Sequence, residues 1–370
     1  MKIAIWGAGK FGRYVFEKLK HKDGDHVVCW IDNNVSMQKE IIEGIPVISQ
    51  QEARLRLGKD LDIILVAFGA SMRLFDTVCD IEENRYGFIK NRVFKASLCF
   101  NDNLLEDRNI VWNKKINKPM IYHLETNIVD YCNLNCKGCS HFSNLFNRGE
   151  KVPFETFCND IKQISKNAYI CRLRLLGGEA LLEDEIVKYM EVARKCLPDA
   201  NIELVTNGLL IPKQTDNFFY AVYQNDIDIA ISGYKPALKM RDAIEEALNK
   251  RNIVYWFSEE VLEFGKNIDL SGSADRKLAA AHCREKKCHF FRCGKLYKCP
   301  FEVLGNKFFQ HYGIDAHLEG GIDIYDESVD WKNAVESLEN DPVDSCKYCG
   351  MEEKIEWAVG TPAINDWIIS

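Results

Sequence analysis

The sequence has no apolar run long enough to cross a bilayer and no excess of basic residues. Its longest apolar stretch, LDIILVAFGA at 61–70, falls well short of the roughly 20 residues that a membrane-spanning helix needs. Lysines and arginines number 48 against 55 aspartates and glutamates, and both signs are mixed along the chain, so a nucleic-acid partner is not expected. The opening residues MKIAIWGAGK also lack the plan of an export signal. We therefore expect a cytoplasmic protein without a membrane partner.

Internal repeats and low-complexity tracts are lacking too, so the whole chain is expected to fold. Its 370 residues suit two or three domains. Cysteine, in contrast, is abundant. The 15 thiols are an odd number, and disulfides rarely persist in the reducing compartment that we expect for this chain. Metal ligation is the natural alternative.

Residues 1–110 alternate between strand and helix patterns. KIAIW, HVVCWID and LDIILVAFG are expected strands, and RYVFEKLK is an expected helix after the turn GAGKFG. This alternation is typical of a parallel, doubly wound sheet, here a truncated Rossmann-like domain. The polar stretch at 101–118 is the expected linker.

A second α/β series over 118–280 predicts a partial (β/α)6 TIM-like barrel. Strands are expected at 120–129, 171–176, 201–206, 227–232 and 253–257. Helices are expected at 153–167, 182–196, 215–225 and 237–250. The remainder, 281–370, is rich in cysteine and glycine and is expected to form a small C-terminal unit.

Three cysteines stand close together directly after the first strand of this second series. CNLNCKGC places Cys132, Cys136 and Cys139 at C-x3-C-x2-C. A loop with this spacing can bind three irons of a four-iron four-sulfur cluster and leave the fourth iron open. A zinc site would need a fourth protein ligand, for which His141 is near enough to keep that alternative. Ordinary buried cysteines are the remaining interpretation.

The triplet resembles the signature of the radical S-adenosylmethionine superfamily. The resemblance implies that the open iron chelates S-adenosylmethionine and that a flavodoxin, ferredoxin or reductase supplies the electron. The family pattern usually has an aromatic residue before the last cysteine, where this chain has Gly138. His141 or Phe142 are possible substitutes for the adenine contact.

Three further motifs follow expected strands, where barrel enzymes place their chemistry. GGEALL resembles the family's Gly-Gly-Glu-Pro motif, with Ala180 in place of proline, and TNG and ISG follow later strands. Each could also be an ordinary turn with a helix cap. By the resemblance, the residues that contact the cofactor would be Gly177, Gly178, Glu179, Thr206, Asn207 and Ser232.

The late cysteines resemble the twitch type of the SPASM domain, an auxiliary-cluster module of some radical S-adenosylmethionine enzymes. The match implies a second cluster, held by Cys283, Cys299, Cys346 and Cys349. Cys288 and Cys293 compete with Cys283 for the first ligand position. Four thiolates in two pairs also suit a zinc ribbon.

The turn GAGKFG fits the dinucleotide-binding pattern G-x-G-x-x-G. Gly7, Gly9 and Gly12 would let the backbone approach a phosphate, and Asp32 could accept a ribose hydroxyl. IDNN and EGIPVIS also resemble the N-terminal domain of bacterial nucleotide-sugar acyltransferases, which implies a possible nucleotide at this domain. A scaffold that has lost its ligand is the alternative.

The leading functional hypothesis is a radical S-adenosylmethionine enzyme acting on a carbohydrate or nucleotide-linked small molecule. Modification of a peptide or protein is the second, because SPASM-bearing relatives often do this. A non-enzymatic iron-sulfur redox sensor and a nicotinamide dehydrogenase with structural zinc rank lower, since the first leaves GGEALL and TNG unexplained and the second leaves the triplet unexplained.

Overall fold

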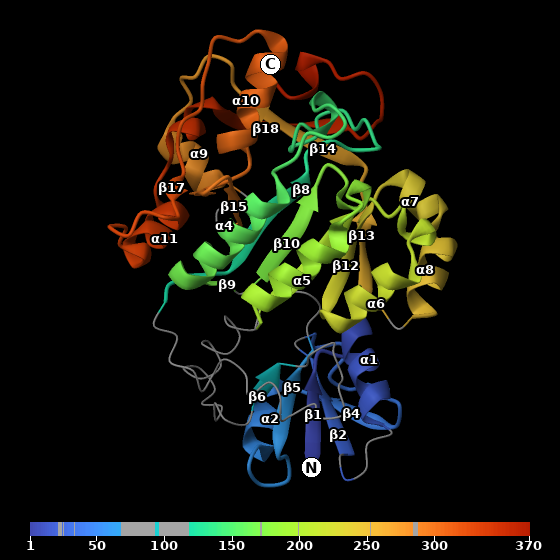
Figure 1. Cartoon of the computed structure of the whole chain (residues 1–370). Coiled ribbons are helices and arrows are strands. Elements are labelled where there is room, and N and C mark those ends of the chain that lie inside the picture. Colours follow the sequence, from blue (N-terminus) through green and yellow to red (C-terminus); the bar gives the residue numbers. More distant parts are fainter. Residues whose placement is uncertain are drawn as a thin grey trace. The chain divides into compact units, whose positions relative to one another are not determined.

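The chain divides into two compact units, Met1–Asn117 and Lys118–Ser370 (Figure 1). The computed structural model describes residues 1–20, 24, 26–32, 34–67, 93–95, 118–170, 172–198, 200–251, 253–283 and 288–370. The expected linker at 101–118 lies outside these ranges except for its last residue. Within them, no helix combines the length and the apolar character needed to cross a membrane.

The first unit is built on a six-stranded sheet in the order β3-β4-β2-β1-β5-β6. Strands β1, β2, β4, β5 and β6 pair in parallel, as the alternating pattern predicts. Ile3, Ile5 and Trp30 are fully buried in its core. Its elements are β1 (Lys2–Trp6), α1 (Lys10–Leu19), β2 (His26–Ile31), β3 (Ile41–Ile42), β4 (Ile45–Ile48), α2 (Gln50–Arg56), β5 (Ile63–Val66) and β6 (Val93–Lys95).

The second unit is built on an eight-stranded sheet in the order β13-β12-β11-β10-β8-β15-β16-β17. Its strands are β8 (His123–Val129), β10 (Arg172–Gly177), β11 (Asn201–Thr206), β12 (Ile227–Gly233), β13 (Tyr255–Glu260), β15 (Cys288–Arg292), β16 (Lys295–Tyr297) and β17 (Ile322–Asp323). Two small sheets pair β7 (Met120–Ile121) with β9 (Tyr169–Ile170) and β14 (Glu263–Ile268) with β18 (Cys349–Glu356).

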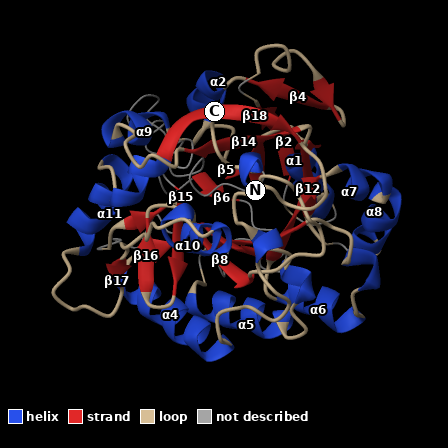
Figure 2. Ribbon diagram, turned by 90° about the horizontal axis from the view of Figure 1, so that it is seen from above, coloured by secondary structure: helices blue, strands red, loops and turns tan. Residues whose placement is uncertain are grey.

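The helices of the second unit are α4 (Phe154–Asn167), α5 (Ile186–Cys196), α6 (Asp216–Gln224), α7 (Lys235–Lys239), α8 (Arg241–Asn249), α9 (Arg276–His282), α10 (Phe301–Tyr312) and α11 (Trp331–Asn340). Short 3-10 turns occupy Ser143–Leu145, Ala180–Leu182, Ile211–Lys213, Asp344–Tyr348 and Ile364–Asp366. Seen from above, α4, α5 and α6 follow one another along one side of this unit (Figure 2).

Two expected helices differ from the structure. The helix expected at 237–250 is broken into α7 and α8, because Met240 has φ −100° and ψ 8°, outside the helical range. The helix expected from residue 182 begins only at Ile186, since the preceding residues form a 3-10 turn capped by Glu179. The strand expected at 120–129 is interrupted at Tyr122, since Met120–Ile121 pairs with β9 in a separate small sheet. The other expected elements of this unit agree with the structure within a few residues.

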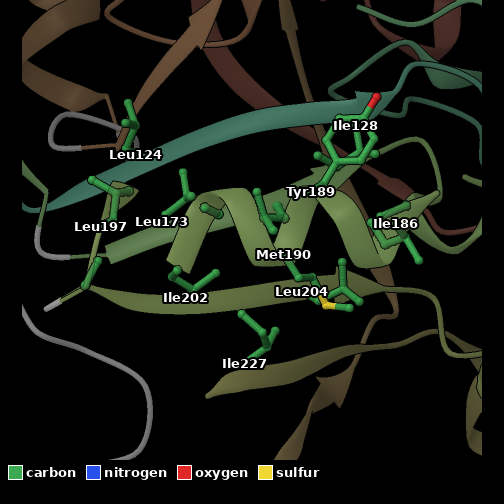
Figure 3. Close-up of a cluster of buried hydrophobic side chains, with 14 of the residues drawn as sticks. Leu124, Ile128, Leu173, Ile186, Tyr189, Met190, Leu197, Ile202, Leu204 and Ile227 are labelled. Atoms are coloured by element: carbon green, nitrogen blue, oxygen red, sulfur yellow. The ribbon is translucent and has the colours of Figure 1, made fainter. Parts of the chain in front are cut away.

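Alternating strand residues separate an apolar face from a charged face. On α5, buried side chains recur at Ile186, Tyr189, Met190 and Ala193, the spacing of one helix face. They pack on the apolar side of β8, β10 and β11 (Figure 3), which contributes Leu124, Leu173, Ile202 and Leu204. On the opposite side, Arg174 forms ion pairs with Glu125 (3.0 Å) and Glu203 (3.2 Å).

Strand β15 lies in the part of the chain expected to form a separate C-terminal unit, yet it pairs in parallel with β8. Phe290 and Phe291 on β15 are fully buried, and Phe291 joins the core that α4 and α5 cover. The sheet therefore continues across the expected boundary at 280/281, because burial of this apolar strand requires a neighbour on both sides.

Candidate functional site

The cysteine loop begins where β8 ends, at the carboxyl edge of the parallel sheet. The amide of Leu134 donates to the sulfur of Cys132 at 3.3 Å. Burial raises the pKa of Cys132 to about 12, and the charges of Cys139 and Cys136 add to the rise. Burial and Cys139 likewise raise the pKa of Cys136 to about 11. Burial thus disfavours the thiolate form of Cys132 and Cys136, and a positive centre beside them would favour it.

Gly177 and Gly178 pack against the chain that enters this loop. A Cβ on Gly177 would stand 2.1 Å from the carbonyl oxygen of Val129, and one on Gly178 would stand 2.1 Å from that of Tyr131. The amides of Gly178 and Glu179 donate to the same two carbonyls, at 2.9 and 3.1 Å. The two glycines are thus required for this close contact, independently of any ligand.

Glu179 connects the motifs that follow β10 and β11. Its side chain is only 1% exposed and accepts hydrogen bonds from the Thr206 hydroxyl (2.6 Å) and the Asn207 amide (2.8 Å). Burial raises the pKa of Glu179, and these donors offset part of the rise. The Asn207 side-chain amide donates to Asn133 at 2.7 Å and lies 3.8 Å from the sulfur of Cys132. Glu179, Thr206 and Asn207 therefore meet at the cysteine loop.

Ser232 is the penultimate residue of β12, and its side chain lies close to that of Tyr234, a residue that no motif in the sequence indicated. Burial raises the pKa of Tyr234, and the charges of Cys139, Cys136 and Cys132 raise it further, so this ring lies near all three thiols. In the sequence, only the position of Tyr234 directly after the ISG motif could have indicated that it belongs to the site.

Gly138 has a left-handed backbone, with φ +66°. The space that a side chain would need there is filled, because a Cβ would stand 2.7 Å from Ile355 and 2.8 Å from the carbonyl oxygen of Asp366. Of the two suggested substitutes for the missing aromatic, Phe142 is buried against Phe308 and Trp367. His141 is held by a 3.0 Å hydrogen bond between its Nδ1 and Asn127. Both rings are thus engaged in packing or hydrogen bonding.

Four of the late cysteines lie close together. Burial raises the pKa of Cys299 well above its usual range, and the charges of Cys349 and Cys283 add to the rise. Burial, Cys346 and Cys283 raise the pKa of Cys349 to about 12. These are the four residues implied by the twitch resemblance.

Cys288 and Cys293 lie elsewhere. The sulfur of Cys288 and one ligand atom each of His123 and Glu125 lie within 4.8 Å of one another. Arg174 already binds Glu125 there, so the carboxylate that a cation would need is taken. Cys293 is exposed in the turn between β15 and β16, with φ +48°.

The distances between the cysteine sulfurs test whether either set is arranged to bind a single zinc ion. Among the described residues, neither cysteine set brings three sulfurs within 4.8 Å of one another. Tetrahedral zinc with Zn–S bonds of about 2.3 Å would draw its sulfurs to about 3.8 Å. In a four-iron cluster each sulfur binds a different iron, so its ligands stand farther apart. The sulfurs of neither set therefore stand at the spacing of zinc ligands.

In the first unit, the glycine turn joins β1 to α1. A Cβ on Gly12 would stand 1.8 Å from the carbonyl oxygen of Gly7, whereas a Cβ on Gly9 meets no atom within 4 Å. Gly7 itself has φ +111°. The Asp32 carboxylate accepts a hydrogen bond from the amide of Ala8 at 3.1 Å, so it holds the turn from the end of β2. Gly12 serves helix packing, and the open face beside Gly9 is where a ligand can approach.

Two family models match parts of the chain. Residues 126–269 match the radical SAM superfamily, and residues 2–73 match the PglD N-terminal domain. GTP 3′,8-cyclase of Thermodesulfovibrio yellowstonii is 31% identical over 104 residues, which are 27% of this chain and 32% of the cyclase. The same-named protein of Heliobacterium modesticaldum is 32% identical over 95 residues, 25% of this chain and 29% of its own. The chain spans about a third of the length of these curated relatives.

Solved structures give weaker likenesses. The crystal structure of BtrN in complex with AdoMet and 2-DOIA has a TM-score of 0.39 and 18% identity, covering 63% of this chain and 92% of BtrN. That of Streptococcus suis SuiB has a TM-score of 0.31 and 11% identity, covering 62% of this chain and 67% of SuiB.

The cysteine loop follows the first strand of the matched region, and the GGE and TNG residues that surround it come from its next two strands. The family match thus coincides with the part of the structure that brings these motifs together. The second unit thus carries a radical SAM superfamily domain at residues 126–269, and the first unit carries a domain of the PglD N-terminal type at residues 2–73.

Proposed function

We propose that this chain binds a four-iron four-sulfur cluster at Cys132, Cys136 and Cys139 and reductively cleaves S-adenosylmethionine there. The single observation that carries the proposal is the contact between the GGE and TNG motifs and the cysteine loop, made through Glu179 and Asn207. When bound, the cluster supplies the electron that splits S-adenosylmethionine into methionine and a 5′-deoxyadenosyl radical, which takes hydrogen from an unreactive carbon.

The chain's own residues would bind and orient the cofactor. The buried Glu179 carboxylate is suited to an ammonium group, since a cation would offset the cost of its burial. Thr206, Asn207 and Ser232 stand at the same edge of the sheet with polar side chains for the ribose. Tyr234 contributes an apolar ring that excludes water from this edge.

For the substrate, we propose a carbohydrate or nucleotide-linked small molecule. The open glycine turn of the first unit supports a nucleotide there. The relatives named GTP 3′,8-cyclase fit a nucleotide-linked substrate.

A second cluster at Cys283, Cys299, Cys346 and Cys349 completes the proposal, with a twitch-like module that could accept an electron from the product. The charges of Cys349 and Cys283 raise the pKa of Cys299, and those of Cys346 and Cys283 raise the pKa of Cys349, so the proximity of these side chains supports this set. Cys288, in the ion-pair group of Glu125, and Cys293, in an exposed turn, are not part of it.

Anaerobic reconstitution with iron and sulfide, followed by reduction with S-adenosylmethionine, tests the proposal through release of 5′-deoxyadenosine. Cys136→Ala should abolish this product yet keep roughly half of the iron, because the two clusters have separate ligands. Product formation by Cys136→Ala, or zinc in place of iron in the wild-type protein, would refute the assignment.

Modification of a peptide or protein is the second candidate, favoured by the SPASM-like late cysteines. Titration of the full chain with nucleotides and nucleotide sugars separates the two. Binding that Gly9→Ala weakens supports the small-molecule substrate, whereas failure of every nucleotide to bind favours the peptide.

A further inference from the structure

The C-terminal strap, residues 355–367, pairs with the cysteine loop. The Lys137 amide donates to the carbonyl of Ala358, and the Gly360 amide donates to that of Asn135, both at 2.9 Å. These bonds form an antiparallel bridge between Cys136 and Val359. Figure 1 shows the loop after β8 (green) beside this C-terminal segment (red). A segment more than two hundred residues away in sequence therefore forms one side of the cysteine loop.

The strap also explains why residue 138 is a glycine. Ile355 and the backbone of Asp366 fill the space that an aromatic side chain would occupy at residue 138. The Trp367 indole donates to the carbonyl of Cys139 at 2.8 Å and fixes the far end of the loop. The aromatic ring beside the loop thus comes from the strap instead of from the loop itself.

Trp357 is the strap residue that faces the sulfurs. Its ring stacks on Tyr234, with centroids 5.3 Å apart and planes 11° apart, and Tyr234 lies near all three thiols. The Trp357 Nε1 is buried and has no acceptor with hydrogen-bond geometry among the described residues. It lies beside Cys136, because Val359, two residues further along the strap, forms the backbone bridge with Cys136, and the Trp357 side chain reaches the Cys136 sulfur.

A buried N–H without an acceptor destabilises a folded protein, so such a group calls for an explanation. A cysteine that binds iron is a thiolate, which accepts hydrogen bonds far better than a thiol. Loading of the cluster would therefore supply the missing acceptor at the position of the Trp357 indole.

We propose that the strap is part of the cluster site and that Trp357 is a positioning residue whose indole N–H donates to the Cys136 thiolate of the loaded cluster. The inference rests on the proposed cluster at Cys132, Cys136 and Cys139. A hydrogen bond to a ligand sulfur stabilises the more negative, reduced cluster and so raises its reduction potential.

Trp357→Phe keeps the ring and removes the donor, and it is compared with Trp367→Phe, which removes an indole bond from the same strap to a carbonyl instead of a sulfur. The full chain, reconstituted anaerobically, is titrated with reductant while the paramagnetic signal of the reduced cluster is followed. We expect unchanged iron content in both variants, and a lower reduction potential in Trp357→Phe than in Trp367→Phe or wild type. Equal potentials in Trp357→Phe and wild type would overturn the proposal.

A second measurement does not depend on substitution of Trp357. Wild-type protein with isotope-labelled indole nitrogens should show coupling between one such nitrogen and the reduced cluster in pulsed paramagnetic resonance, and Trp367→Phe should retain it. Absence of coupling overturns the role of Trp357. A wild-type protein without any iron-sulfur signal would instead refute the proposed function on which this inference rests.

Discussion

Arg292 binds Asp130 through two parallel hydrogen bonds, from Nη1 at 2.8 Å and Nη2 at 2.7 Å. This pair joins the ends of β15 and β8, and Asp130 is only 1% exposed. Because removal of one partner leaves a buried charge, we expect Arg292→Met to lower the free energy of unfolding by about 3–5 kcal/mol. Arg292→Lys should recover only part of this loss, since lysine lacks the planar fork.

Urea unfolding followed by circular dichroism measures this difference. Arg276→Met is the matched control, because its ion pair with Asp344 is exposed on both sides and should contribute little. Equal loss in the two variants would contradict the structural importance of the Arg292–Asp130 pair.

Substitution of two glycines in the first unit distinguishes a role in packing from a role in ligand binding. Gly12→Ala should unfold this unit, since its Cβ would meet the Gly7 carbonyl at 1.8 Å. Gly9→Ala has open space and should leave thermal unfolding unchanged while weakening any nucleotide bound at the turn. Calorimetric titration checks the second effect. Unchanged nucleotide affinity in Gly9→Ala would show that the turn does not contact the ligand.

Glu125 should make stability depend on acid pH. Burial alone would raise its pKa, but the hydrogen bond from His123 and the charge of Arg174 lower it from 4.5 to about 2. The unfolded chain therefore takes up a proton first as the pH falls. The stability that Glu125 contributes is complete above about pH 4.5 and is lost as the pH falls toward 2.

We expect Glu125→Gln to cost ~3 kcal/mol at neutral pH, with a difference from wild type that shrinks below about pH 4.5. Urea unfolding at several pH values measures it. Glu185→Gln, at an exposed pair with Lys188, should show little effect at any pH. A constant difference for Glu125→Gln across the acid range would contradict the lowered pKa.

The iron content of cysteine variants shows which of the late cysteines bind the proposed second cluster. Cys299→Ser should lose roughly half of the iron, because Cys299 would bind one of two clusters. Cys293→Ser, in an exposed turn of the same segment, should keep all of it. Colorimetric iron assays on anaerobically reconstituted protein give the answer. Equal loss in both variants would remove Cys299 from its assigned role.

The sequence predicted the elements whose patterns are local. The strand and helix alternation from 120 to 233 needed only periodicity, and the cysteine triplet was recognisable from spacing alone. The meeting of Glu179 with Thr206 and Asn207 followed from the rule that parallel strands end at one edge.

What could not be predicted depends on contacts between distant segments. Nothing in CHFFR indicates that β15 pairs with β8, because a short apolar strand fits any free edge. In the sequence, Gly138 is a departure from the family pattern. A glycine is needed there because Ile355 and Asp366, more than two hundred residues away in the chain, approach its Cα closely. Trp357 and Tyr234 carry no motif of their own.

The pairing of β15 with β8 also determines which truncated forms of this protein can fold. Removal of residues 281–370 would strip β8 of β15, one of its two neighbours, and leave that side of β8 as an open edge, which invites aggregation. It would take the strap away from the cysteine loop as well. Expression of the region matched by the radical SAM family model as an isolated fragment should therefore give insoluble material, whereas residues 118–370 keep the whole compact unit together.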